Sequence, residues 1–127
     1  MTISLTDFYN DPDWQQAFET VDYSGYNVLN ITDVTQIIVA DPGKRGGEAW
    51  LGVFRMKGGK YITMRAIADT IGWDQAMGAY SLVEWFSDLS DALARLAEFP
   101  REAWGEQQEV RMERIQKHLK DTFNVTW

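Results

Sequence analysis

The stretch AWLGVFRMKGGKYITMRA, residues 49–66, decides how the rest of the chain can fold. Two runs rich in strand-forming residues meet at Gly58-Gly59. This pair suits a two-residue hairpin turn, because glycine tolerates the positive φ that such a turn requires. A turn centred on this pair places Met56 opposite Tyr61. We therefore predict a β-hairpin at the centre of the chain.

Both faces of this hairpin are expected to be apolar. With that register, one face carries Trp50, Phe54, Met56 and Tyr61, and the other carries Leu51, Val53, Ile62, Met64 and Ala66. Because neither face is polar, the pattern predicts cover on both sides of the hairpin, or an aromatic face left free to bind a partner.

Helical signals lie on both sides of the strand-rich centre. Asp11 is suited to an N-cap and Pro12 to the first helical position, after a shorter turn that Thr6 would cap. The stripe that follows has helical spacing: Trp14, Ala17, Phe18 and Val21. Two more helices are predicted near the C-terminus, one capped by Ser87 or Ser90 and running to Glu98, and one over about 101–124.

Strand patterns occupy 34–40, 49–57, 60–68 and 79–86. No pattern of strand, crossover helix and parallel strand is present. The chain is therefore predicted to be one α+β domain over residues 1–127. It consists of an antiparallel meander of about four strands packed against an N-terminal helix and two C-terminal helices. The N-terminal helix and the helix over 89–97 are expected to cover one face of the sheet.

Composition excludes several classes of protein. The chain has 127 residues, 45% of them hydrophobic, and contains no cysteine, so disulfides and thiolate chemistry are excluded. No apolar run approaches the length that crosses a bilayer, and the N-terminus lacks the features of a signal peptide. We expect a cytoplasmic protein that does not associate with membranes.

Charge is distributed unevenly along the chain. The net charge is −7, yet residues 1–43 hold seven acids and no lysine or arginine, whereas residues 44–66 sum to +5. Such a distribution is consistent with a solvated acidic surface that aids solubility, or with an acidic surface that binds a basic partner. The hairpin would be the positive feature on an acidic body.

No catalytic constellation is recognisable. His118 is the only histidine, and we expect it to face solvent on a helix. Asp69 and Asp74 bracket a glycine loop and could hold a hard cation in an enzyme, but the spacing of an EF-hand is absent. We therefore predict no enzymatic activity, no metal site and no cofactor.

Two sets of residues are candidates for binding. Aromatic rings beside acids in loops match the residue types that anchor protein interfaces, which gives a partner-binding set of Asp22, Tyr23, Tyr26, Asp69, Trp73 and Asp74. Alternatively, basic and aromatic side chains alternate along the hairpin, as they do in proteins that bind single-stranded nucleic acid. The nucleic-acid-binding set would then be Arg55, Lys57, Lys60 and Tyr61.

The segment GGKYITMRAIADTIGWDQAMGAY resembles a group of small uncharacterised proteins from phages and bacteria. In these proteins a strand leads to a loop like Gly-Cys-Asp-Tyr-x-Gly-Trp-Asp-Cys-Gln and then to an acidic helix. Asp69, Gly72, Trp73, Asp74 and Gln75 match that pattern, whereas Ala68 and Gln75-Ala76 stand where cysteines or their neighbours would be expected. The resemblance implies a phage-like origin and no known activity.

Together these observations predict a small acidic protein of a phage or mobile element. It would bind and inhibit a host protein with a basic surface, such as a nucleic-acid-handling defence factor. Its oligomeric state is left open. The alternative is a nucleic-acid-binding module that uses the basic hairpin.

Overall fold

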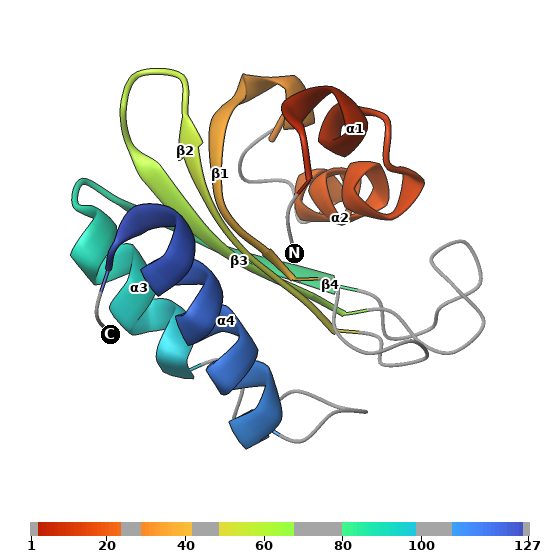
Figure 1. Cartoon of the computed structure of the whole chain (residues 1–127). Coiled ribbons are helices and arrows are strands. Elements are labelled where there is room, and N and C mark those ends of the chain that lie inside the picture. Colours follow the sequence, from red (N-terminus) through yellow and green to blue (C-terminus); the bar gives the residue numbers. More distant parts are fainter. Residues whose placement is uncertain (1–2, 24–28, 42–48, 68–79, 99–107, 126–127) are drawn as a thin grey trace.

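A computed structural model of the chain describes residues 3–23, 29–41, 49–67, 80–98 and 108–125 (Figure 1). The elements, in chain order, are α1 (Leu5–Tyr9), α2 (Pro12–Tyr23), a 3₁₀ turn (Ile31–Asp33), β1 (Val34–Asp41), β2 (Ala49–Met56), β3 (Tyr61–Ile67), β4 (Tyr80–Phe86), α3 (Leu89–Glu98) and α4 (Gln108–Phe123). The strands form one antiparallel sheet in the order β1-β2-β3-β4. The predicted α+β meander is confirmed.

The helices lie on opposite faces of the sheet. Figure 1 shows α1 and α2 on one side and α3 and α4 on the other. Two separate core clusters correspond to these two sides. The expectation that the N-terminal helix and the helix over 89–97 share one face is therefore wrong. Since the sheet is apolar on both faces, one helical layer could not cover it.

Rings from the N-terminal helices surround Phe54 in the first cluster. The centroid of the Phe54 ring lies 5.0 Å from that of Phe8, 5.6 Å from that of Trp14 and 5.8 Å from that of Phe18. All four side chains are buried. This packing explains why α1 and α2 dock on the face of the sheet that carries Phe54.

The N-terminal helices begin at polar caps. The Asp11 carboxylate accepts hydrogen bonds from the backbone N–H of Asp13 (2.9 Å) and of Trp14 (3.2 Å), which confirms the predicted N-cap of α2. For α1 the predicted cap, Thr6, is wrong. Ser4 caps this helix instead, because its backbone is extended and its Oγ accepts from the N–H of Asp7.

The β2–β3 turn holds three residues rather than two. The N–H of Gly59 donates to the carbonyl of Met56 (3.0 Å), and the N–H of Met56 donates to the carbonyl of Lys60 (2.8 Å). Gly58 and Gly59 have φ of 92° and 90°, so both glycines of the turn have the positive φ that was expected.

The third loop residue shifts the register of the hairpin. Arg55 lies opposite Tyr61 and Phe54 opposite Ile62, so the predicted pairing of Met56 with Tyr61 is wrong by one residue. A slip of one residue exchanges the faces of a strand. Ile62, Met64 and Ala66 consequently share the face of Phe54, while Tyr61 packs beneath α3 and α4.

The second cluster joins α3 and α4 to the sheet. Ala92, Leu93 and Leu96 of α3 are buried, as are Ile115 and Leu119 of α4. The Thr63 hydroxyl adds a buried hydrogen bond of 2.7 Å to the Ala92 carbonyl.

No helix in the described parts of the chain is long and apolar enough to cross a membrane.

Candidate functional site

The predicted partner-binding residues lie mostly beyond what the structure describes. Asp22 and Tyr23 are the last two residues of α2, where only the backbone is described. Tyr26, Asp69, Trp73 and Asp74 fall outside the described residues, as does any cation site between the last two acids. This set therefore stays a prediction.

The alternative set at the hairpin divides into two parts. Arg55, Lys57 and Lys60 are exposed near the turn. Lys57 lies 3.4 Å from the carboxylate of Asp33, and this pair is open to solvent. Tyr61 is half-buried; it lies opposite Arg55 in the β2–β3 ladder and packs against the cluster under α3 and α4. The basic side chains of this set are therefore exposed, whereas the ring that was expected to stack on a nucleobase is partly covered.

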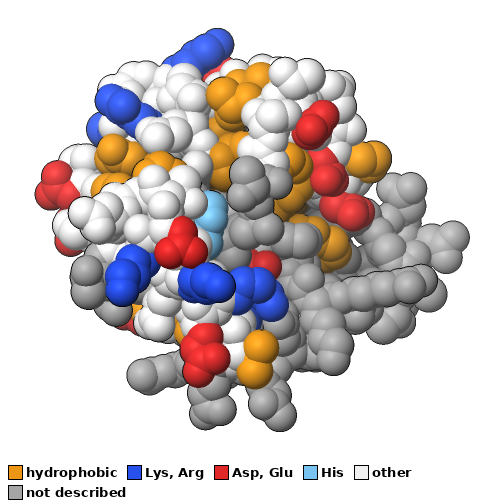
Figure 2. All heavy atoms as spheres, viewed as in Figure 1, with side chains coloured by type: hydrophobic (Ala, Val, Ile, Leu, Met, Phe, Trp, Pro, Cys, Tyr) orange, Lys and Arg blue, Asp and Glu red, His pale blue; other side chains and the backbone are white. Residues whose placement is uncertain are grey.

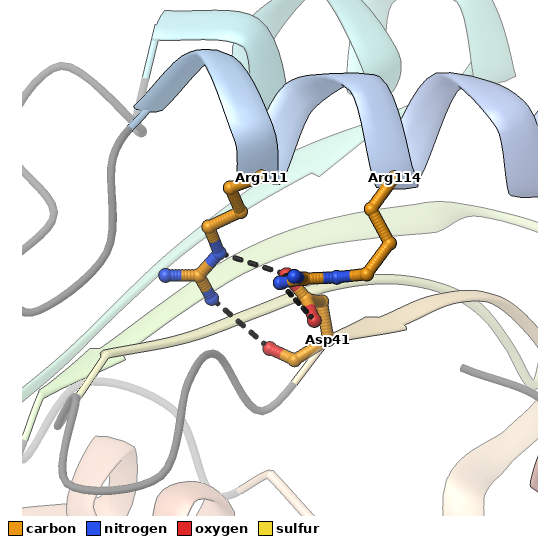
Figure 3. Close-up of polar contacts among 3 residues, drawn as sticks. All are labelled: Asp41, Arg111 and Arg114. Atoms are coloured by element: carbon orange, nitrogen blue, oxygen red, sulfur yellow. Dashed lines mark hydrogen bonds and ion pairs between the residues drawn. The ribbon is translucent and has the colours of Figure 1, made fainter.

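A buried polar cluster joins the end of β1 to α4 (Figure 3). Arg111 donates from Nε to a carboxylate oxygen of Asp41 (2.8 Å) and from Nη2 to the backbone carbonyl of Asp41 (3.1 Å). Arg114 reaches both oxygens of the same carboxylate, at 3.0 and 2.9 Å. One aspartate therefore fastens two successive turns of α4 to the sheet.

The burial of this cluster is more complete than is usual for ionised side chains. Arg111 is 0% and Asp41 3% exposed. Buried arginine and aspartate are rare unless they are paired. We interpret the cluster as structural, because it lies between the sheet and α4.

Burial of arginine makes the rest of the molecule more negative than the total charge suggests. Among the residues that the structure describes, the buried charged side chains are Arg65, Arg111 and one acid, Asp41. Since these three sum to +1 and the chain totals −7, the other residues together carry −8. Figure 2 shows acidic side chains over α1 and α2 and basic ones at the tip of the β2–β3 hairpin.

His118 is held against the sheet. It is half-buried, and its Nε2 lies 2.9 Å from the carbonyl of Ile38 in β1. Its ring also meets Phe123 edge-on, with 6.0 Å between centroids. The expectation that His118 faces solvent is wrong. The side chain lies at the edge of the buried face of α4, where this helix contacts β1.

The outer strand β4 carries exposed apolar side chains. Leu82 and Trp85 are each 45% exposed, and the only other exposed large hydrophobic side chain among the described residues is Val110 on α4. Leu82 lies opposite Arg65 on the α3 face, and Trp85 lies opposite Ile62 on the α2 face. Both faces of one strand therefore show apolar surface to solvent.

An acidic border accompanies β4. Asp88, which follows the strand, and Asp91 and Glu98 on α3 are exposed, as is Glu84 on β4 itself. Arg95 of α3 donates to Glu84 (3.0 Å) and also pairs with Glu98. We call Glu84, Asp88, Asp91 and Glu98 the acidic border. Arg95 is the basic residue that pairs with two acids of this border.

Arg95 keeps its charge within this border. Desolvation lowers the pKa of Arg95, but hydrogen bonds and coulombic attraction to Glu98 and Glu84 outweigh it, so that the pKa is raised above its ordinary value. The border therefore retains a net charge of −3 at neutral pH, from four acids and one base.

Comparison with protein-family models, with curated proteins and with solved structures finds no match for this chain. Within the residues that the structure describes, no three histidine, aspartate or glutamate side chains lie close enough together to hold a metal ion. Any functional interpretation therefore depends on the surface of the protein itself.

The sequence held signals for both features that the prediction missed. Arg111 precedes Ile115 and Leu119 by one and two helical turns on the same stripe, which places it on the buried face of α4. In β4, the residues before and after Glu84 in the sequence are apolar, and so are most residues on each face of the strand. An outer strand with this pattern has no polar face to turn to solvent.

Proposed function

We propose that this protein binds another protein that has a positively charged surface, and that it blocks that partner. In the form predicted from the sequence, it is a small non-enzymatic inhibitor from a phage or mobile element, acting on a host factor that handles nucleic acid. The observation that carries the proposal is the charge of −8 left outside the buried Asp41 and arginine residues.

Electrostatics explains how such a surface would act. A surface of one sign speeds encounter with a partner of the opposite sign and excludes partners of the same sign. A host protein that binds nucleic acid offers a basic surface to an acidic ligand. The proposed partner would be bound at the surface that it uses for the polyanion.

Salt-dependent capture tests the proposal. The full chain is immobilised and incubated with nuclease-treated bacterial lysate at about 0.1 M and about 0.5 M salt, because exposed charges are screened over this range. We expect basic proteins to be enriched at low salt and released at high salt. No enriched protein, or one retained equally at both concentrations, would overturn the proposal.

Matched variants locate the acidic surface involved. One variant carries D7N and D13N on α1 and α2, and the other carries D88N and D91N beside β4. All four aspartates are exposed, and each variant loses two charges. We expect one variant to lose the captured protein and the other to keep it. Equal retention by both would mean that neither surface is the binding site.

The alternative function, nucleic-acid binding, is favoured by the three exposed bases near the hairpin turn, Arg55, Lys57 and Lys60. It predicts a mobility shift with single-stranded DNA that weakens with salt and is lost in a K57E/K60E variant. Absence of a shift with the unaltered protein would exclude this alternative.

A further inference from the structure

The two edges of the sheet are protected to different degrees. Strand β1 has irregular register at two points, between Val34 and Gln36 and between Ile37 and Val39. Its backbone is also capped by side chains, since the Tyr9 hydroxyl donates to the Val34 carbonyl (2.5 Å) and His118 Nε2 lies 2.9 Å from the Ile38 carbonyl. Irregular pairing and covered carbonyls are devices that prevent an edge from pairing with another chain.

In the described part of the chain, strand β4 shows neither irregular pairing nor covered carbonyls. Its seven residues pair with β3 in continuous register and contain no proline. Among the described residues, no group outside β3 bonds to the backbone of residues 82–86. Its single charge, on Glu84, is engaged by Arg95. A regular edge of this length with exposed Leu82 and Trp85 is a template for a further strand.

We propose that β4 is the partner-binding edge, and that an extended basic segment of the partner protein adds to it as a fifth strand. This inference rests on the proposed function, whose binding site it specifies. Main-chain hydrogen bonds to β4 would supply affinity, and side chains on alternate faces would supply specificity.

Charge identifies the kind of segment that fits. On the α3 face, the added strand would lie beside the acidic border, whose four acids outnumber the two arginines of that face, the paired Arg95 and the buried Arg65. On the α2 face it would lie beside Trp85 and the half-buried Val83. Because side chains of a strand alternate between faces, the segment would alternate basic with apolar residues.

A second copy of this chain fits the same edge less well. Antiparallel pairing of β4 with itself would bring α3 of both copies to the same side of the joined sheet. The two acidic borders would then face each other with a net charge of −3 on each. Like charges across an interface cost several kcal/mol, so charge favours a basic segment over a second copy.

A synthetic peptide tests the edge directly. The probe is a peptide of about nine residues that alternates lysine and valine, a typical length for a strand. Controls are a peptide that alternates glutamate and valine, and a lysine–valine peptide in which two valines are replaced by proline. We expect the first peptide alone to bind, with shifts and slower hydrogen exchange at the backbone amides of residues 82–86.

Three single variants provide the matched comparison. L82K and W85K place a charge on the edge, and V110K places the same charge on an equally exposed apolar residue of α4. We expect L82K and W85K each to weaken peptide binding by about tenfold, the scale of an interface anchor, and V110K to leave it unchanged. Circular dichroism checks that all three remain folded.

The outcomes separate this inference from the proposed function. If a basic protein is captured in a salt-dependent way but the peptide does not bind, or if L82K, W85K and V110K behave alike, the proposed function stands and the β4 site is wrong. If the unaltered protein is a dimer that W85K converts to monomer, a second copy occupies the edge and the basic segment is wrong. If the peptide binds at residues 82–86 and no basic protein is captured, the edge is supported and the proposed function is wrong.

Discussion

Replacement of Asp41 by asparagine tests the contribution of the buried cluster to stability. The side chain keeps its size but loses the charge that Arg111 and Arg114 both contact, at 2.8 to 3.0 Å. The backbone carbonyl of residue 41 still accepts a hydrogen bond from Arg111, so one of the hydrogen bonds of Arg111 is retained. Removal of one member of a buried ion pair costs about 3–5 kcal/mol. Because of the retained bond we expect the lower end, about 3 kcal/mol.

That loss is large for a chain of this size. A domain of this length is stable by about 10 kcal/mol, so D41N would remove about a third of the free energy of unfolding. With the usual entropy of unfolding per residue, the melting temperature should fall by about 10 °C.

Urea titration followed by tryptophan fluorescence measures the effect, since the chain contains six tryptophans. D33N is the matched control, because the ion pair between Asp33 and Lys57 is exposed and should contribute less than about 0.5 kcal/mol. If D41N also costs less than about 1 kcal/mol, the ionised carboxylate does not fasten α4 to the sheet and the reasoning is refuted.

Two further substitutions test the packing on each face of the sheet. A Cβ added at Gly52 would come within 2.4 Å of two ring carbons of Phe54. G52A should therefore destabilise the protein by about 2 kcal/mol and lower its urea midpoint, and an unchanged midpoint would contradict the packing described. T63V removes the buried hydroxyl that donates to the Ala92 carbonyl, so we expect a loss of about 1–2 kcal/mol. T35V removes an exposed hydroxyl and should change stability by less than about 0.5 kcal/mol, and equal effects of T63V and T35V would be inconsistent with a buried bond.

Local chemistry made the elements predictable. Asp11 followed by Pro12 marks a helix start by a mechanism that needs no tertiary contact, and the strand-rich runs around Gly58-Gly59 identify a hairpin in the same way. The meander followed from the order of those elements. The register did not, because a glycine pair fits a two-residue and a three-residue loop, and the choice reverses one strand face.

Tertiary information was needed to predict which face of the sheet each helix covers and which side chains of β4 are exposed. Nothing local states that α2 and α3 take opposite faces, since each has one apolar stripe that fits either. The spacing of Arg111 from Ile115 and Leu119 places it on the buried stripe of α4, a signal that the sequence prediction did not use. The exposure of Leu82 and Trp85 depends on β4 being the last strand of the sheet, which the described order establishes.

The contact of α4 with β1 has a consequence for synthesis of the chain. Arg111 lies 70 residues after Asp41, and His118 lies 80 residues after Ile38, so the contacts that α4 makes with β1 can form only late in synthesis. A nascent chain with α1, α2 and the sheet in place would display buried-type side chains such as Val39 and Leu51 to the solvent. That intermediate is a natural target for a chaperone that recognises apolar surface as the polypeptide leaves the ribosome.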